Sequence, residues 1–169
     1  MLYFALWVGF LLRVLAAMWN DLKPIDVTKI DAIGFYSHAI QFSKNPVLSD
    51  FFSPPVGYDY FRFLGFIYYL TVDSWLLGSI ISVLAWLFSA IILMRTMCLL
   101  EVSKRHQSYA MLIYAFLPSC ILFTSTTLRE SFELLFVNFA IYSALKIYLT
   151  KSRVHFLITF CSFLYVSLA

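Results

Sequence analysis

Residues 75–100 read WLLGSIISVLAWLFSAIILMRTMCLL, a run in which Arg95 is the only charged residue. A helix needs about 20 consecutive apolar residues to cross the hydrocarbon core of a bilayer. This run therefore predicts a membrane-spanning helix, and it indicates that the whole chain is an all-α polytopic membrane protein.

The composition of the complete chain agrees with that prediction. Of the 169 residues, 62% are hydrophobic and 12% are charged, and the mean hydropathy is +0.86. Soluble domains carry about 25% charged residues, so this chain has too few charges to cover a surface that faces water. The net charge of +3 is small and dispersed, with no stripe of Lys and Arg between aromatic residues, which excludes nucleic acid as a partner and leaves the lipid bilayer.

Further apolar runs on both sides of residues 75–100 predict about five spans in total. The others cover residues 1–19, 109–123, 131–149 and 154–169, and since no Gly/Ser-rich linker divides them we expect a single transmembrane domain over 1–169. The run over residues 60–70 is also apolar, but at 1.5 Å per residue it extends only about 17 Å, half the thickness of the core. We therefore predict that residues 60–70 form a helix on the membrane surface.

The charges between the spans predict the orientation. With the N-terminus in the cytoplasm, six basic residues and one acid lie on the cytoplasmic side: Arg95, Lys104, Arg105, Lys146, Lys151 and Arg153 against Glu101. The opposite side receives eight acids and five basic residues: Asp21, Asp26, Asp31, Asp50, Asp59, Asp73, Glu130 and Glu133 against Lys23, Lys29, Lys44, Arg62 and Arg129. Because Lys and Arg mark cytoplasmic loops, we expect a multi-pass protein of the cell inner (plasma) membrane. Its N-terminus is cytoplasmic and its large outer loop covers residues 20–74.

The outer loop contains a second helical pattern. From Asp31 to Gln41 the polar positions recur at helical spacing, and the pattern ends before Pro46. Asp31 lies at the start of this amphipathic segment, on the same polar face as His38. One interpretation makes Asp31 a general base or a metal ligand beside the lipid headgroups, and the other makes it the N-cap of the helix. His38 is either a partner in binding or a structural residue.

A second candidate site lies where the chain enters the span over residues 131–149. Glu130 and Glu133 are three positions apart and share a helix face, with Arg129 beside them. Carboxylates at the mouth of a helix bundle suit a divalent cation, and an arginine there suits a phosphate. The alternative is structural: Thr127 and Glu130 fit a capping box at the start of the helix, and a Glu near a helix N-terminus complements the helix dipole.

Arg13 is a charge inside the first span. It lies about 9 Å from the outer end of that span at 1.5 Å per residue, a depth at which a charge is costly. Its side chain either snorkels to the interface or pairs with an anionic substrate group or an acid of the outer loop.

Several of these features follow one another along the chain. They are Arg13 late in the first span, the segment DAIGFYSHA from Asp31 to Ala39, Pro54-Pro55-Val56-Gly57-Tyr58 before a surface helix, and Leu117-Pro118-Ser119 followed by Ser125 to Glu130. Their order resembles the N-terminal module of the GT-C membrane glycosyltransferases, which include mannosyl- and aminoarabinosyltransferases that depend on dolichyl- or polyprenyl-phosphate sugars. The resemblance covers nearly the whole chain, through short motifs to which order and spacing give weight.

The resemblance implies an enzyme of the cell envelope that transfers a sugar from a polyprenyl-phosphate donor to a lipid, glycan or protein. Asp31 matches the catalytic acid that acts as the base, and Glu130 matches the second acid. Because some family members use a divalent metal ion, Asp31 and Glu130 are also the candidate metal ligands. Arg129 is a looser match to a phosphate-binding group, and Arg13 and His38 complete the expected substrate-binding set.

The chain also departs from the family. Family members have more spans and usually a soluble C-terminal part, whereas this chain stops at Ala169. A truncated gene product, a fragment and a subunit that needs a partner membrane protein all fit that difference. A non-catalytic membrane subunit or remnant is therefore the main alternative function. A small transporter is disfavoured, because apart from Arg13 we expect no charged or discontinuous helix near the midplane.

Overall fold

The computed structural model describes residues 2–23, 26–44, 46 and 59–150, and in this part of the chain it contains helices and no strand. The helices are α1 (Leu2–Leu22), α2 (Asp26–Lys44), α3 (Asp59–Leu70), α4 (Trp75–Leu99), α5 (Lys104–Phe116), α6 (Pro118–Thr124) and α7 (Glu130–Thr150). The all-helical prediction is confirmed for this part. The predicted span over 154–169 and the segment Pro54-Pro55-Val56-Gly57-Tyr58 lie outside the described residues.

Within the described residues, three helices, α1, α4 and α7, are long and apolar enough to cross a membrane. They coincide with the predicted spans over 1–19, 75–100 and 131–149, while α3 is not among them, in agreement with a surface helix over 60–70. α1 leaves a face of large apolar side chains exposed, with Phe4 at 66% and Leu15 at 61%. α4 and α7 also expose large apolar side chains. Contact of such faces with water is unfavourable, so the fold indicates a helical membrane protein.

The predicted span over 109–123 is not one helix. α5 and α6 together are apolar enough to cross a membrane, but the chain bends by 57° between them. Pro118 causes the break, because it has no N–H to continue α5 and instead takes the first position of α6. The expectation that the spans are continuous is therefore wrong at this position.

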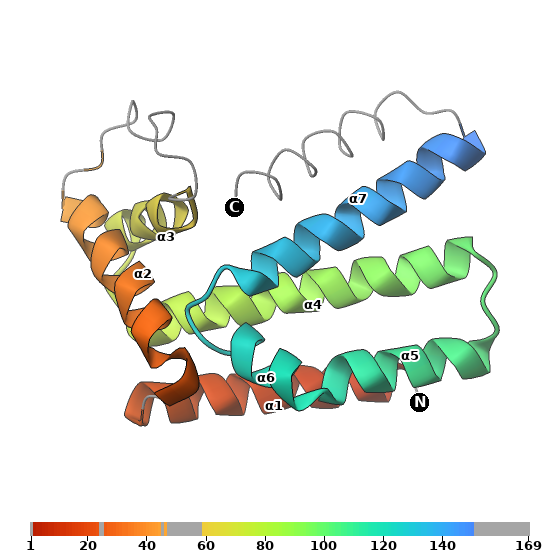
Figure 1. The fold of residues 1–169 in the computed structure, drawn as a ribbon, viewed down its shortest axis with the longest axis horizontal. Helices are drawn as coiled ribbons and strands as arrows, with labels where there is room; N and C mark the ends of the chain where they lie inside the picture. The colour runs from red at the N-terminus through yellow and green to blue at the C-terminus, as the bar shows by residue number, and fades with distance from the viewer. Residues whose placement is uncertain (1, 24–25, 45, 47–58, 151–169) are drawn as a thin grey trace.

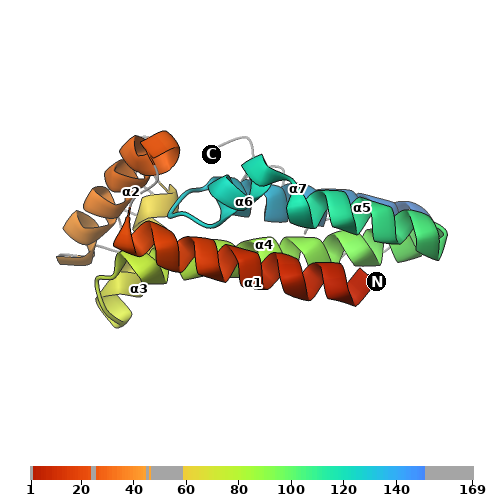
Figure 2. The ribbon, with the colours of Figure 1, turned by 90° about the horizontal axis from the view of Figure 1, so that it is seen from below.

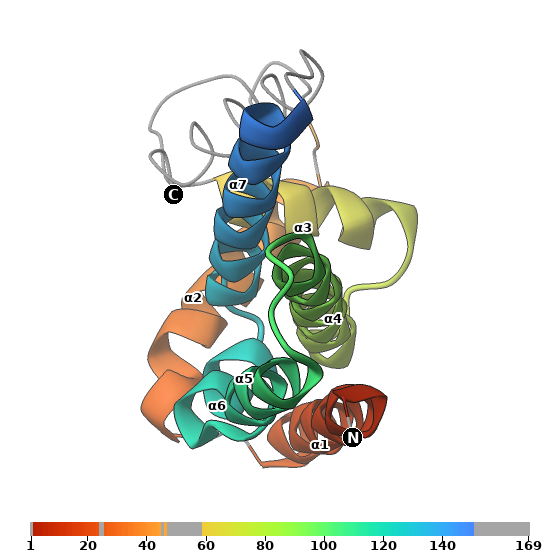
Figure 3. The same cartoon turned by 90° about the vertical axis from the view of Figure 1, so that its right-hand side faces the viewer.

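The long helices run alternately in opposite directions (Figure 1). α4 lies at the centre, where it packs against α7 and α1, and α1 also packs against α5. The view along the bundle in Figure 3 shows α7, α4 and the pair of α1 and α5 as successive neighbours. α2 and α3 pack against each other and lie beyond one end of the bundle (Figure 2).

The two ends of the bundle differ in charge. One end, here named the basic end, gathers the C-termini of α4 and α7 and the N-terminus of α5 (Figure 1), and it carries Arg95, Lys104, Arg105 and Lys146 against Glu101. The opposite end, the acidic end, carries Asp21, Asp31, Asp59, Asp73, Glu130 and Glu133 with Lys23, Lys29, Lys44, Arg62 and Arg129. The alternating topology thus separates the charges as the predicted span order requires.

Small residues on one face of α4 let its neighbours approach closely. Gly78, Ser82, Ala85 and Ser89 recur on this face and are all buried. The Ser82 hydroxyl donates a hydrogen bond to the Leu128 carbonyl at 3.3 Å, and Ser79 Oγ lies 3.2 Å from Thr127 Oγ1. These contacts fix the segment that leads into α7 against the start of α4.

Farther along the same face, a polar network joins α4, α5 and α7. Asn138 Nδ2 donates to Ser89 Oγ at 2.7 Å, and Ser89 Oγ lies 2.8 Å from the Tyr114 hydroxyl. We expect Asn138→Leu to lower the free energy of unfolding by roughly 1 kcal/mol, the usual value for a hydrogen bond between membrane helices. Unfolding in mixed micelles by SDS titration measures this change. A variant as stable as the parent would mean that the network contributes nothing to stability.

Candidate functional site

Aromatic rings hold α2 and α3 against the bundle at the acidic end. The ring centroid of Tyr36 on α2 lies 5.1 Å from that of Trp75 at the start of α4. On α3, the rings of Tyr60 and Phe63 lie 5.5 Å and 5.6 Å from the ring of Phe132 on α7. Tilted and edge-to-face pairs of this kind are favourable beyond the area that they bury. They attach α2 to the start of α4, and α3 to the first turn of α7, where Glu130 and Glu133 lie.

Two tyrosines of this contact have hydroxyl groups whose pKa is raised above its ordinary value. Burial raises the pKa of the Tyr68 hydroxyl, and the neighbouring Tyr60 and Tyr36 raise this pKa further. Burial also raises the pKa of Tyr36, with a further contribution from the charge of Asp73. Both phenols are therefore neutral at physiological pH, and their contribution is to packing.

Asp31 lies inside α2 and not at its start. α2 begins at Asp26, so Asp31 occupies the second turn and its side chain is exposed. The alternative that made Asp31 the N-cap of this helix is therefore wrong. Asp31 on α2 and Glu130 in the first turn of α7 both lie at the acidic end of the bundle. The structure thus places the two predicted catalytic acids at the same end, and a direct contact between them stays a prediction.

A groove with a volume of about 450 Å³ lies next to Glu130, between α6 and α7. α6 contributes Ser119, Cys120, Phe123 and Thr124 to its lining, and α7 contributes Glu130, Glu133, Leu134 and Val137. One oxygen of Glu130, Oε2, is buried and accepts no hydrogen bond within the described part of the chain. A buried carboxylate oxygen without a hydrogen bond is costly. It is therefore the atom of this groove most suited to accept a hydrogen bond from a ligand.

Glu133, the other acid that lines this groove, already forms an ion pair. Arg129 Nε lies 3.2 Å from Glu133 Oε1, one helical turn along α7. The hydroxyl of Thr127 donates to the Trp75 carbonyl at 3.3 Å, on α4. α7 begins at Glu130, so Thr127 lies three positions before the helix and the alternative of a capping box is wrong. Glu130 and Glu133 both lie in the first turn, where their charges complement the helix dipole, and Glu130 is the acid that remains for a ligand.

Arg13 neither snorkels nor reaches the acids. Its side chain is fully buried, with 0% exposure, and its guanidinium lies 3.6 Å from the centroid of the Trp86 ring. Nη1 donates to the Ala115 carbonyl at 2.8 Å, and Nη2 donates to the Tyr114 carbonyl at 3.4 Å. These are carbonyls that the break at Pro118 leaves without a helical N–H donor. Arg13 therefore satisfies the broken end of α5.

Arg13 also acts on the groove between α6 and α7. Its Nε donates to Thr124 Oγ1 at 2.8 Å, and Thr124 in turn donates to the carbonyl of Cys120. Thr124 and Cys120 both line the groove. Arg13 thus holds Thr124 in the wall of the groove through a hydrogen bond from inside the bundle, and does not itself line the groove.

His38 makes an aromatic contact on α2. Its side chain is exposed, and its ring centroid lies 5.4 Å from that of Phe61 on α3. This contact agrees with a structural role in the pairing of α2 and α3. Substrate binding by His38 stays a prediction.

The donor set does not make a complete metal site. Among residues 2–23, 26–44, 46 and 59–150, no group of three or more His, Cys, Asp or Glu side chains is arranged to hold a metal ion. Asp31 and Glu130 supply two carboxylates, whereas Ca²⁺ takes six to eight oxygen ligands and Mg²⁺ takes six. The divalent ion stays a prediction from the resemblance, and no chemical step is assigned to it.

Sequence reasoning missed the wall that α6 forms, including Thr124. The signal for it is a proline inside an apolar run followed by the small polar residues 124–127, a pattern typical of an interrupted span. Comparison of the chain with protein-family models, with curated proteins and with solved structures finds no match, so the candidate site is defined by its own geometry.

Proposed function

We propose that this protein is a membrane glycosyltransferase of the GT-C type, with its site at the acidic end. The observation that carries the proposal is the buried Oε2 of Glu130, which accepts no hydrogen bond within the described part of the chain and lies beside a groove at the end of the bundle that also carries Asp31. The apolar residues of that groove, such as Leu134 and Val137, suit the isoprenoid chain of a polyprenyl-phosphate sugar. The carboxylates suit the hydroxyl groups of the sugar and of its acceptor.

In the proposed reaction Asp31 is the general base. Its carboxylate accepts the proton of an acceptor hydroxyl, and the oxygen of that hydroxyl forms a bond to C1 of the donor sugar. The bond between C1 and the phosphate oxygen breaks, and polyprenyl phosphate leaves with the electron pair. The exposure of Asp31 allows a lipid, glycan or protein acceptor to reach it. Glu130 accepts a hydrogen bond from the sugar and holds C1 in line with the attacking oxygen.

The two arginines have different proposed roles. Arg129 lies beside the acids, where its guanidinium suits the donor phosphate. Arg13 is a positioning residue, because it fixes Thr124 in the wall of the groove and makes no contact outside the bundle.

The proposed location is the cell inner membrane, with the acidic end on the non-cytoplasmic side. The basic end then faces the cytoplasm, in agreement with the excess of Lys and Arg in cytoplasmic loops. A donor lipid in the outer leaflet would have its phosphate at the level of the acidic end.

A non-catalytic membrane subunit is the second candidate function, and the arginines favour it. Arg13 donates its hydrogen bonds within the bundle, and Arg129 pairs with Glu133 at 3.2 Å. Two residues predicted to hold phosphate thus make internal contacts. In that case the chain scaffolds a partner membrane subunit, and its acids carry no chemistry.

Replacement of Asp31 distinguishes the two functions. We expect Asp31→Asn to lower the rate of sugar transfer roughly a hundredfold, since a positioned general base contributes about 10²–10⁴. The measurement uses the protein in vesicles with labelled polyprenyl-phosphate hexoses and pentoses, and it follows the release of polyprenyl phosphate. Glu130→Gln should also slow transfer, because Oε2 would lose its charge.

Asp21→Asn is the matched control, because Asp21 is an exposed acid at the same end, on α1, to which the proposed reaction assigns no role. It should leave the rate unchanged. If Asp31→Asn and Glu130→Gln retain the full rate, the catalytic assignment is wrong. If no donor is consumed by the parent protein, the non-catalytic subunit is the better description.

A further inference from the structure

A second and larger groove lies far from the acids, at the basic end. It has a volume of about 780 Å³ and lies between α1, α4 and α7. Its wall is apolar, with Leu6 and Trp7 from α1 and Ile91 and Met94 from α4. The proposed sugar transfer uses no residue of this groove.

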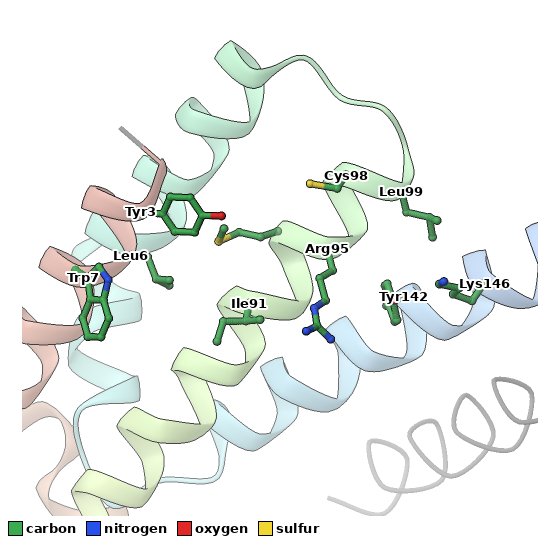
Figure 4. A pocket seen from close by; sticks show the side chains of 10 residues that line it. Tyr3, Leu6, Trp7, Ile91, Arg95, Cys98, Leu99, Tyr142 and Lys146 are labelled. Atoms are coloured by element: carbon green, nitrogen blue, oxygen red, sulfur yellow. The ribbon is translucent and has the colours of Figure 1, made fainter.

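Two cations stand at the rim of this groove. Arg95 is exposed, and within the described part of the chain it has no ion pair or hydrogen bond. Lys146 Nζ lies 5.9 Å from the centroid of the Tyr142 ring, which also lines the groove. Figure 4 shows the Arg95 guanidinium and the Lys146 amine on either side of Tyr142. No acid is among the lining residues.

The two cations lie at matching depths. Arg95 precedes Leu99, the last residue of α4, by four positions, and Lys146 precedes Thr150, the last residue of α7, by four. At 1.5 Å per residue both stand about 6 Å inside their helix ends. This is the depth at which a long basic side chain reaches the headgroups while its stem stays in the apolar zone.

We propose that this groove binds an anionic phospholipid of the surrounding leaflet. Arg95 and Lys146 hold the phosphate of the headgroup, because guanidinium and ammonium groups form charge-assisted hydrogen bonds with phosphate. An acyl chain of the lipid packs against the apolar wall of the groove, which Leu6 and Trp7 of α1 and Ile91 and Met94 of α4 form. A free phosphate ion would match the cations, but it would leave the apolar wall without a partner.

The test uses the fluorescence of Trp7, which lines the groove. The protein is placed in phosphatidylcholine vesicles that contain a minor fraction of brominated lipid, either phosphatidylglycerol or phosphatidylcholine. Trp7→Phe identifies the part of the quenching that arises at the groove. We expect brominated phosphatidylglycerol to quench this part several-fold more strongly than brominated phosphatidylcholine at the same mole fraction.

Loss of the cations should remove this preference. Each of Arg95→Gln and Lys146→Gln should weaken the apparent affinity for phosphatidylglycerol about fivefold, as expected for one basic residue at an anionic surface. Arg105→Gln is the matched control, because it removes the same charge from the same end but does not line the groove. It should leave the preference unchanged.

Three results would overturn the lipid site. Equal quenching by the two brominated lipids would show that the groove does not distinguish an anionic headgroup from a zwitterionic one. An equal loss of preference in Arg105→Gln would show that the general charge of the basic end attracts the lipid, without a site. Displacement of phosphatidylglycerol by millimolar inorganic phosphate would show that the cations bind the free ion. Since none of these measurements involves Asp31 or Glu130, failure of the lipid site leaves the sugar-transfer proposal unaffected.

Discussion

Arg13→Leu is expected to destabilise the bundle by about 3 kcal/mol, the cost of leaving buried hydrogen-bond acceptors without donors. The carbonyls of Tyr114 and Ala115 receive their hydrogen bonds from Arg13, since Pro118 interrupts the helix that would otherwise supply them. No water is present in the hydrocarbon core to replace the lost donor. The loss should be visible as unfolding at a lower SDS fraction in mixed micelles.

Two further variants make this result specific. Arg13→Lys keeps the charge but not the planar fork of donors, so it should show an intermediate loss. Arg105→Leu removes an exposed cation at the basic end and should change the free energy of unfolding by no more than about 0.5 kcal/mol. A bundle that becomes more stable in Arg13→Leu would contradict the expectation, because the cost of burying the charge would then exceed the gain from its hydrogen bonds.

Gly65→Ala is expected to disrupt the contact between α2 and α3 at a cost of about 3 kcal/mol, the upper part of the range for an overpacked core. A Cβ at this position would lie 2.6 Å from the carbonyl oxygen of Ala39 and 3.0 Å from the ring of Phe42. The carbonyl belongs to the backbone of α2 and cannot rotate away as a side chain can. The two helices must therefore move apart, and Asp31 moves with α2.

Hydrogen–deuterium exchange measures this separation directly. The amides of α2 should exchange roughly a hundredfold faster in Gly65→Ala, since local opening follows the local free energy, while those of α4 keep their parent rate. Gly34→Ala is the matched control on α2, because a Cβ at that position would meet no described atom within 4 Å. Alanine there should slow exchange, as it favours the helix by about 1 kcal/mol over glycine. Faster exchange in both variants would mean that the close approach at Gly65 has no special role.

The spans at α1, α4 and α7 were predictable because their signal is local. The length and apolarity of residues 75–100, for example, are properties of one segment, and α4 coincides with it. The same holds for α3, whose shortness alone excludes a complete crossing. The start of α2 was not predictable in this way, since the polar residues Asp26 and Lys29 hide the beginning of the helix.

The site was predictable as a set of residues but not as an arrangement. Asp31 and Glu130 stand out by residue type, but their placement at the same end depends on the aromatic contacts of α2 and α3 with α4 and α7. Pro118 signals a break by itself. The compensation of that break by Arg13 is a contact over 102 positions of the chain, and no local pattern contains it.

The hydrogen bonds of Arg13 also set an order of events during synthesis. The arginine leaves the ribosome with the first helix, whereas the carbonyl of Ala115 follows 102 positions later. At roughly 5–20 residues per second, the arginine waits on the order of 5–20 s for its acceptor. During that interval the first helix carries a cation whose burial in the hydrocarbon core is energetically costly. Its buried position in the bundle thus depends on a segment that has not yet been made.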